Sequence, residues 1–145
     1  MVSLGRHFRL HESDFLKRRR AFLKADAKSS AALRRKIAKQ GELVCGISWH
    51  SRLSEFGTDK SMPLTALGEL FKLPGLRFVD LQYGDTRSER AALRAAGGPQ
   101  LVHINGLDTT RDLDQLASLV DACDMVVTVS NTTAHIAGAL GKPTW

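Results

Sequence analysis

The residues best placed to do chemistry stand together near the end of the chain, where Ser130, Asn131, Thr132 and Thr133 follow a short β-branched run. Small polar side chains directly before a helical apolar pattern are typical of a helix N-terminus. The free N–H groups of such a turn and the positive end of the helix dipole suit a phosphate, and the hydroxyl groups can donate to the same oxygens. The sequence therefore predicts an anion site at this junction.

His135 adds a second possible donor to this site. It follows Asn131 by four residues, so the two side chains share one helix face, and an imidazole there can donate to a phosphate oxygen. The alternative is that the polar residues are plain helix caps and that His135 is a surface histidine, because Ser, Asn and Thr are common at helix starts.

The elements that position this junction alternate regularly from residue 41 onward. The expected strands are 43–49, 76–82, 101–105 and 125–129, with the start of a truncated fifth at 142–145. The expected helices lie at 64–71 and 87–96, from Thr109 or Thr110 onward, and after Ser130. Strands separated by helices of about ten residues imply right-handed crossovers and a parallel sheet. The predicted fold class is therefore α/β, a Rossmann-like sheet preceded by a basic helical segment at 1–40.

In a parallel sheet, the loops that follow the strands gather at one edge, and ligands of open α/β sheets bind there. These loops are expected at 50–62, 83–86, 106–111 and 130–132, and they are rich in hydrogen-bonding residues. We therefore expect the binding site at the carboxyl edge of the sheet.

Length and composition set limits on this prediction. The chain has 145 residues, of which 43% are apolar, enough for one domain with a core. No apolar stretch approaches a membrane span, and the first ten residues lack a signal-peptide core, so the expected location is cytoplasmic. Cys45 and Cys123 have no metal-ligand spacing and are expected to be buried thiols.

The net charge of +6 is unevenly distributed. Residues 1–40 hold twelve Lys and Arg against three Asp and Glu, whereas the remainder holds nine against twelve. The basic residues cluster at 17–20 and 34–36, which favours a solvated helical face or an arm that docks on an acidic surface. Nucleic-acid binding is not expected, because the aromatic residues of base-stacking surfaces are missing.

Five short segments, taken in order and spacing, resemble the C-terminal, donor-binding half of GT-B glycosyltransferases. They lie at 46–49, 60–64, 81–85, 112–116 and 130–143. The likeness is to the heptosyltransferase-like enzymes of glycosyltransferase family nine and to related glycosyltransferase domains that follow tetratricopeptide repeats in many bacterial proteins. It covers residues 41–145, with the first forty residues matching only as a linker helix.

The resemblance implies that the Ser130 turn, through Thr133, holds the diphosphate of a nucleotide sugar and that His135 faces the phosphates. It also implies a phosphate-contacting lysine at Lys60 and a strand-end contact at Ser51, for which Arg52 is an alternative. The alternative for Lys60 is an ordinary exposed loop lysine. Heptosyltransferases usually carry an aspartate where this chain has Ser130, so heptose-specific roles do not transfer.

Three weaker candidates for the binding site lie at the same edge of the sheet. Tyr83 and Gly84 end the second strand, where a glycine lets a ligand approach the backbone, and Glu89 has the chemistry to accept hydrogen bonds from ribose hydroxyls. The alternative for Glu89 is a first-turn carboxylate favoured by the helix dipole.

Metal binding is not expected. Asp112 and Asp114 are explained by capping and the helix dipole, and the lone histidines His50 and His103 suggest no ligand cluster, with His103 expected to pack within its strand. Neither a metal nor a cofactor is predicted.

The resemblance implies an enzyme that transfers a sugar from a nucleotide-diphosphate donor to a hydroxyl of a protein or saccharide acceptor, with inversion and without a metal. In such enzymes the acceptor site and the catalytic base lie largely in an N-terminal domain, and no catalytic residue is identified here. We therefore expect 41–145 to be a C-terminally incomplete donor-binding half-domain, part of a truncated or fragmentary protein, that binds nucleotide without independent turnover. The alternatives are a degenerate, non-catalytic nucleotide-binding module and a scaffold piece. An exposed sheet edge would favour association.

Overall fold

The computed structural model describes residues 10, 11, 13, 21–51 and 60–145. Three parallel strands form its sheet in the order β2-β1-β3: β1 (Leu43–Ser48), β2 (Leu76–Asp80) and β3 (Met125–Thr128). The helices are α3 (Ala27–Ile37), the 3-10 turn η1 (Leu64–Leu67), α4 (Gly68–Phe71), α5 (Arg87–Ala95), α6 (Leu113–Asp121) and α7 (Thr132–Ala139). The predicted α/β class is confirmed, and so is the parallel direction of the strands.

The prediction of four strands and a truncated fifth is wrong in the number of strands. Within the described residues, the expected third strand contributes one bridge, from Val102 to Val79, and the expected fifth contributes one from Thr144 to Val126. β2 stops at Asp80, whose carboxylate accepts hydrogen bonds from the Gln82 backbone and the Thr86 hydroxyl, so no ladder continues beside residues 103–105. The chain beyond Val102 then turns at Gly106, whose φ is +85°.

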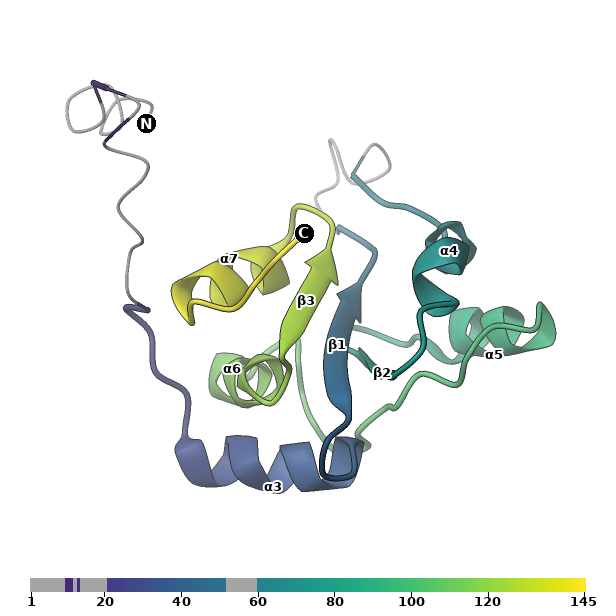
Figure 1. Ribbon diagram of the computed structural model, residues 1–145, viewed down its shortest axis with the longest axis horizontal. Coiled ribbons are helices and arrows are strands. Elements are labelled where there is room, and N and C mark those ends of the chain that lie inside the picture. The colour runs from purple at the N-terminus through teal and green to yellow at the C-terminus, as the bar shows by residue number, and fades with distance from the viewer. Residues whose placement is uncertain (1–9, 12, 14–20, 52–59) are drawn as a thin grey trace.

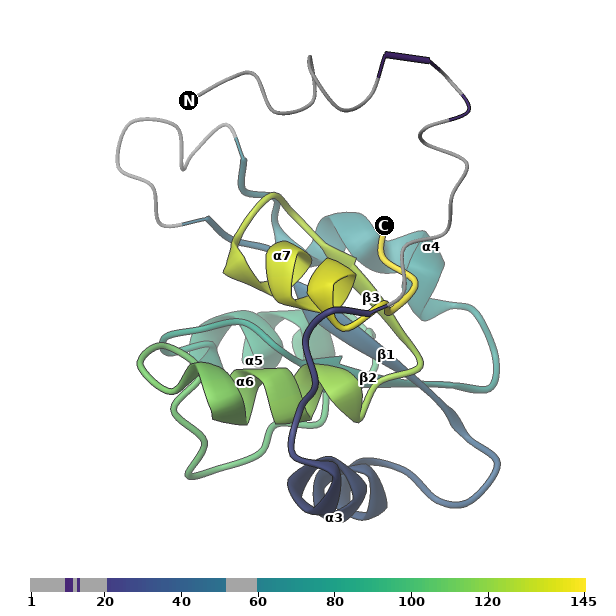
Figure 2. The same ribbon diagram turned by 90° about the vertical axis from the view of Figure 1, so that its left-hand side faces the viewer.

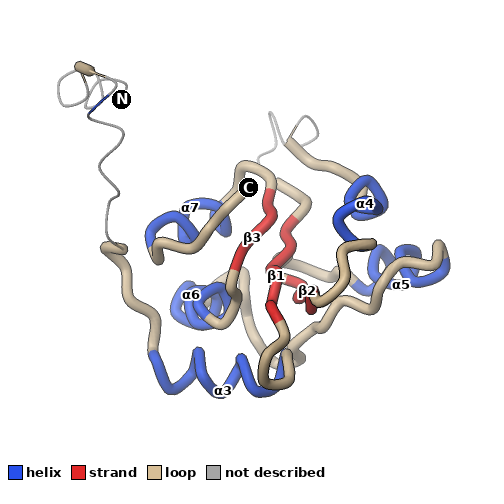
Figure 3. The backbone as a smooth tube through the Cα atoms, viewed as in Figure 1, coloured by secondary structure: helices blue, strands red, loops and turns tan. Residues whose placement is uncertain are grey.

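Alternate residues of β1 face two separate apolar layers. Val44 packs with α3, α6 and α7 in one cluster, whereas Cys45 and Ile47 pack with Leu64 and Leu93 from η1 and α5 in the other. Figure 1 and the tube in Figure 3 show α3, α6 and α7 on one side of the sheet and α4 and α5 on the other. The sheet is thus covered on both faces, as the apolar character of its strands requires.

Helix α3 packs into the main core. Its N-cap Asp26 accepts a hydrogen bond from the Ser29 N–H at 2.7 Å, and Leu33 and Ile37 are buried in the cluster that contains Val44. Before it, residues 21–26 run beside α7, where the N–H groups of Phe22 and Leu23 both donate to the Ala139 carbonyl (Figure 2). The basic run at 17–20 lies outside the described residues.

Both cysteines are buried, as expected. Burial raises the pKa of the Cys45 thiol to about 11 and raises the pKa of Cys123 as well. Both side chains therefore stay protonated and act as core residues. In the described segments, no helix combines the length and the apolar composition that crossing a bilayer requires.

Candidate binding site

The carboxyl ends of β1 and β3 border a pocket of about 360 Å³ at the start of α7. Its walls come from four loops at this edge: Ser51, Tyr83, Thr109, Thr110, Leu113, Asn131 and Thr132. Four of these residues, Ser51, Tyr83, Asn131 and Thr132, were predicted from sequence as site residues. The parallel sheet therefore brings distant candidates together because every strand ends on the same side.

The turn before α7 is held by Asn131, the N-cap of the helix. Its Oδ1 accepts a hydrogen bond from the Ala134 N–H at 3.3 Å, and its Nδ2 donates to Ser48 Oγ at 2.8 Å and to the His50 carbonyl at 3.0 Å. The Asn131 side chain is thus occupied on both sides, and it ties α7 to the end of β1. Its part in the site is to fix the turn.

The other predicted residues of this turn divide into exposed and buried positions. Thr132 and Ser130 are exposed, and Thr132 lines the pocket. Thr133 is completely buried, and its hydroxyl finds no hydrogen-bond partner within the described chain. Helix geometry leaves the N–H groups of Thr132 and Thr133 without intrahelical acceptors, but only Thr132 is exposed, so its N–H is the one available to an anion. The Thr133 side chain itself points away from solvent.

The predicted residues His135 and Lys60 are not among those that line the pocket. His135 is exposed on the first turn of α7. Lys60 is also exposed, and it is the first residue that the structure describes after position 51. Residues 52–59, and with them the alternative Arg52, lie outside the described residues. Ser51 does line the pocket, is 8% exposed, and donates its N–H to Ser61 Oγ at 3.1 Å.

The predicted nucleoside contacts do not all line the same pocket. Tyr83 lines the pocket and donates its hydroxyl to the His50 carbonyl at 3.3 Å, while Gly84 lines a neighbouring pocket. Glu89 faces neither pocket. Its Oε1 accepts from the Trp49 indole N–H at 3.0 Å and is paired with His50 Nε2. Glu89 therefore already has partners at the end of β1, and its carboxylate fixes Trp49 and His50.

The neighbouring pocket, of about 390 Å³, shares Thr109 and Thr110 with the first and extends along β2 to Asp80, Gln82 and His103. Asp80 is the centre of its polar wall. Its side chain is fully buried, and its Oδ2 accepts from Thr86 Oγ1 at 2.6 Å and lies 3.0 Å from His103 Nδ1 and 3.2 Å from Arg90 Nε. A buried carboxylate needs such partners, because an unpaired charge is costly to bury.

Sequence reasoning missed Asp80, Gln82 and the two threonines. The available signal was the placement of two polar residues, Asp80 and Gln82, at the end of an otherwise apolar strand, which marks the edge where ligands bind. His103 was expected to pack within a strand, whereas it reaches sideways to Asp80 and remains partly exposed.

The aspartates near α6 are structural. Asp112 caps the helix, since its Oδ1 accepts the Gln115 N–H at 2.9 Å, and this backbone hydrogen bond lowers the pKa of Asp112. No group of three or more His, Cys, Asp or Glu side chains suited to a metal occurs in residues 10, 11, 13, 21–51 and 60–145.

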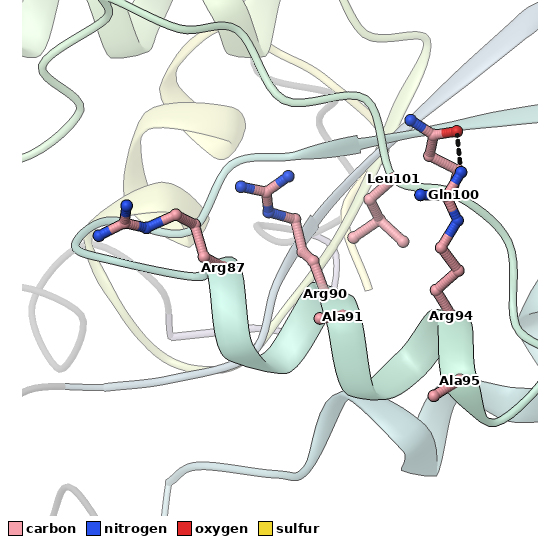
Figure 4. A pocket seen from close by; sticks show the side chains of 7 residues that line it. All are labelled: Arg87, Arg90, Ala91, Arg94, Ala95, Gln100 and Leu101. Atoms are coloured by element: carbon pink, nitrogen blue, oxygen red, sulfur yellow. Dashed lines mark hydrogen bonds between the residues drawn. The ribbon is translucent and has the colours of Figure 1, made fainter.

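A third hollow lies between α5 and residues 100–101, where Arg87, Arg90 and Arg94 stand on successive turns of the helix (Figure 4). Each guanidinium already has a partner. Arg87 pairs with Asp85, Arg90 with Asp80 and Thr86, and Arg94 with Gln100. The side-chain hydrogen bond from Arg87 lowers the pKa of Asp85 well below its usual range. This internal pairing makes the groove a weaker candidate than the pocket at α7.

Comparisons with known proteins place this geometry in context. No family model matches the sequence. The chain is 34% identical over 128 residues to Protein FlbA of Caulobacter vibrioides, a match that covers 87% of this chain and 22% of FlbA. In three dimensions it matches the E. coli ADP-heptose LPS heptosyltransferase II with a TM-score of 0.64 over 84% of this chain and 38% of the enzyme, at 19% sequence identity. The predicted resemblance to part of a GT-B heptosyltransferase fold is thereby confirmed, and the chain spans well under half of either relative.

Proposed function

We propose that this chain is the donor-binding portion of a glycosyltransferase and that the pocket at the start of α7 takes the diphosphate of a nucleotide sugar. The observation that carries the proposal is the position of Thr132, whose unpaired backbone N–H begins α7 at the wall of a pocket shared with Ser51 and Tyr83. The fold likeness to a heptosyltransferase supports the same assignment.

In this proposal, a phosphate oxygen accepts a hydrogen bond from the N–H group of Thr132, and the helix dipole adds favourable potential. Lys60 supplies positive charge and His135 a hydrogen-bond donor, and the adjoining pocket beside Tyr83 and Gly84 takes the nucleoside. Stabilising the negative diphosphate favours its departure from the sugar. The sugar would pass to a hydroxyl of a protein or saccharide acceptor.

A non-catalytic binding module is the second candidate, and one observation favours it. The seven residues that line the pocket carry no carboxylate, imidazole or amine, so this part of the structure provides no general base to deprotonate an acceptor. On either reading, this chain binds nucleotide diphosphates through the start of α7.

Thr132→Pro tests the proposal. Thr132 is the first residue of α7 and follows an extended N-cap, with φ −148° and ψ −173° at Asn131, so a proline fits there while removing one N–H from the proposed cradle. We expect calorimetry to show nucleoside diphosphates binding to the wild-type chain and about tenfold weaker binding to the variant, as loss of a hydrogen bond to a charged group implies.

Ala27→Pro is the matched control. Ala27 is the first residue of α3 and also follows an extended N-cap, Asp26, but it lies far from the pocket in the sequence and on another helix. It should bind as the wild type does. Equal affinities for wild type and Thr132→Pro, or no binding by the wild type, would contradict the proposal.

A further inference from the structure

Gln82 is a buried residue just beyond β2 that lines the pocket beside Gly84 but not the pocket at Thr132. Its Oε1 accepts three hydrogen bonds, from Ser48 Oγ at 3.0 Å, the Trp49 N–H at 2.9 Å and the His50 N–H at 2.8 Å. Two of these donors are backbone N–H groups, which only donate. The atom that faces them must therefore be the amide oxygen, and its orientation is fixed by chemistry.

Ser48 transmits this orientation across the sheet. Because Gln82 Oε1 can only accept, Ser48 must give its single hydroxyl proton to Gln82. The lone pairs of Ser48 Oγ then face Asn131, whose Nδ2 donates to it at 2.8 Å. The same Nδ2 group also donates to the His50 carbonyl at 3.0 Å, so the side of Asn131 that faces β1 must be its NH₂ group.

The outer side of Asn131 is consequently its oxygen. Oδ1 accepts from the Ala134 N–H at 3.3 Å, and it lies 3.1 Å from Thr128 Oγ1, whose single proton is also within reach of the Val129 carbonyl at 2.9 Å. Reversing the amide would place an NH₂ group against the Ala134 N–H, and the start of α7 would lose its cap. Gln82, which acts through Ser48 and also holds the His50 N–H, and the His50 carbonyl therefore orient Asn131 in the same direction, and Asn131 carries this orientation to the first turn of α7.

We propose that Gln82 is a positioning residue for the anion site: acting through Ser48 and Asn131, it helps to fix the start of α7 so that the N–H of Ala134 is capped and that of Thr132 is left for a phosphate ligand. This inference rests on the proposed function, because it assigns a role in the binding of that same diphosphate. It adds a residue outside the diphosphate pocket that helps to set which donors this pocket presents.

The test uses the full chain, with inorganic pyrophosphate as a probe that is independent of base and sugar. Ser48→Ala removes the relaying hydroxyl, Gln82→Met removes the accepting oxygen at similar size, and Ser48→Thr keeps the hydroxyl. Gln100→Met is the matched control, since Gln100 is exposed and contacts only Arg94 among the hydrogen bonds found for it. Affinity is measured by calorimetry, and the amide signals of residues 132–134 are followed by NMR without ligand, at a temperature where every variant is folded.

We expect Ser48→Ala and Gln82→Met each to weaken pyrophosphate binding about fivefold, as the loss of one hydrogen bond implies, and to shift the three amide signals. The double variant should bind no more weakly than either single variant, because both act on one path. Ser48→Thr and Gln100→Met should match the wild type. A merely structural role would lower the melting temperature and leave the affinity and the amide signals unchanged, which would overturn the inference.

Additive losses in the double variant would also overturn it, because the two residues would then act separately. If Gln82→Met fails to fold, Ser48→Ala, which removes a single oxygen atom, decides the question by the same two measurements. If the wild type binds no pyrophosphate and no nucleoside diphosphate, the proposed function fails. Unchanged amide signals in Ser48→Ala, with binding intact in the wild type, would overturn the positioning role alone.

Discussion

At the scale of single residues, the carboxyl edge of the sheet is organised by neutral side chains. Asn131 and Gln82 each use both ends of their amides, and Asn131 joins segments more than eighty positions apart in the sequence. The charged groups, Asp80 and Glu89, are satisfied by residues of the protein itself. The pocket at α7 consequently offers backbone N–H and hydroxyl groups, a chemistry suited to phosphate oxygens.

Gly46 shows how tightly β1 is packed behind this edge. A Cβ atom at Gly46 would lie 2.3 Å from Leu81 Cδ1 and 3.0 Å from Cys123 Sγ. We expect Gly46→Ala to lower the free energy of unfolding by about 1–3 kcal/mol, the usual cost of overpacking a core, as measured by urea denaturation.

Gly138→Ala is the control for this prediction. Gly138 lies within α7, and a Cβ atom added there would meet none of the described residues within 4 Å apart from its chain neighbours and the backbone of its own helix. Alanine should therefore raise the free energy of unfolding by about 0.5–1 kcal/mol through helix propensity. If the two variants shifted stability in the same direction, the packing argument at Gly46 would be wrong.

At the scale of elements, α3 is attached to the sheet by charge as well as by apolar packing. Arg34 donates to Asp124 Oδ2 at 2.7 Å and to the Ala122 carbonyl at 3.1 Å, and Asp124 also accepts the Val44 N–H. Partial burial raises the pKa of Asp124, but the Val44 N–H and the Arg34 guanidinium together lower it by more, so the pKa falls below the usual 3.8.

This pKa predicts a pH dependence of stability. A carboxyl group whose pKa is depressed in the folded state stabilises the protein above its unfolded pKa and loses that contribution as the pH falls through the folded pKa. We expect Asp124→Asn to be less stable than the wild type at pH 7 and the difference to shrink below about pH 4. Urea denaturation at several pH values measures this.

Asp114→Asn serves as the control, because Asp114 is exposed in the first turn of α6 and remote from Arg34 in the contacts that the structure gives. Its stability difference should be small and should vary little with pH. A constant difference between Asp124→Asn and wild type from pH 7 to pH 3 would refute the linkage to Asp124.

The elements also show what the sequence was able to predict. Apolar periodicity located β1, β2, β3, α5, α7 and the segment of η1 and α4 to within a few residues, because a buried strand or helix face must be apolar. It gave no bounds for α3 within the basic segment 1–40. It placed the start of α6 too early, at Thr109 or Thr110. Asp108 accepts hydrogen bonds from the N–H groups of Thr110 and Arg111, so a turn occupies this segment and the helix begins only after Asp112.

The candidate site was predictable in location but not in its internal pairing. Residue type and the parallel sheet sufficed to bring Ser51, Tyr83 and Thr132 to one pocket. No local pattern indicates that Glu89 bonds Trp49 and His50, about forty positions away, or that Thr133 is buried. Such contacts depend on how loops and helices pack across the sheet, which short-range spacing does not encode.

At the scale of the whole molecule, the chain corresponds to a portion of larger relatives: 22% of FlbA and 38% of the heptosyltransferase chain. The proposed division of labour is that this portion binds the donor while acceptor binding and the catalytic base are supplied elsewhere. The two apolar layers on the faces of the sheet form its own core, so donor binding is testable on the chain itself.

We therefore expect the chain alone to bind nucleoside diphosphates without transferring sugar. The measurement is product formation from nucleotide-sugar donors with saccharide and peptide acceptors, monitored by mass spectrometry at protein concentrations above the dissociation constant. Sustained transfer by this chain would show that it contains a catalytic base, and the proposed division of labour would then be wrong.

The burial of Trp49 gives the protein a built-in optical reporter. Trp49 has no solvent exposure, and its indole N–H is bonded to Glu89 at the end of β1, whereas Trp145, the other tryptophan, is 68% exposed. Replacing Trp145 with phenylalanine would leave one emitting indole at the carboxyl edge of the sheet, in an apolar setting and next to a carboxylate. Its fluorescence would then report, without any label, on changes at the end of β1 as ligands arrive.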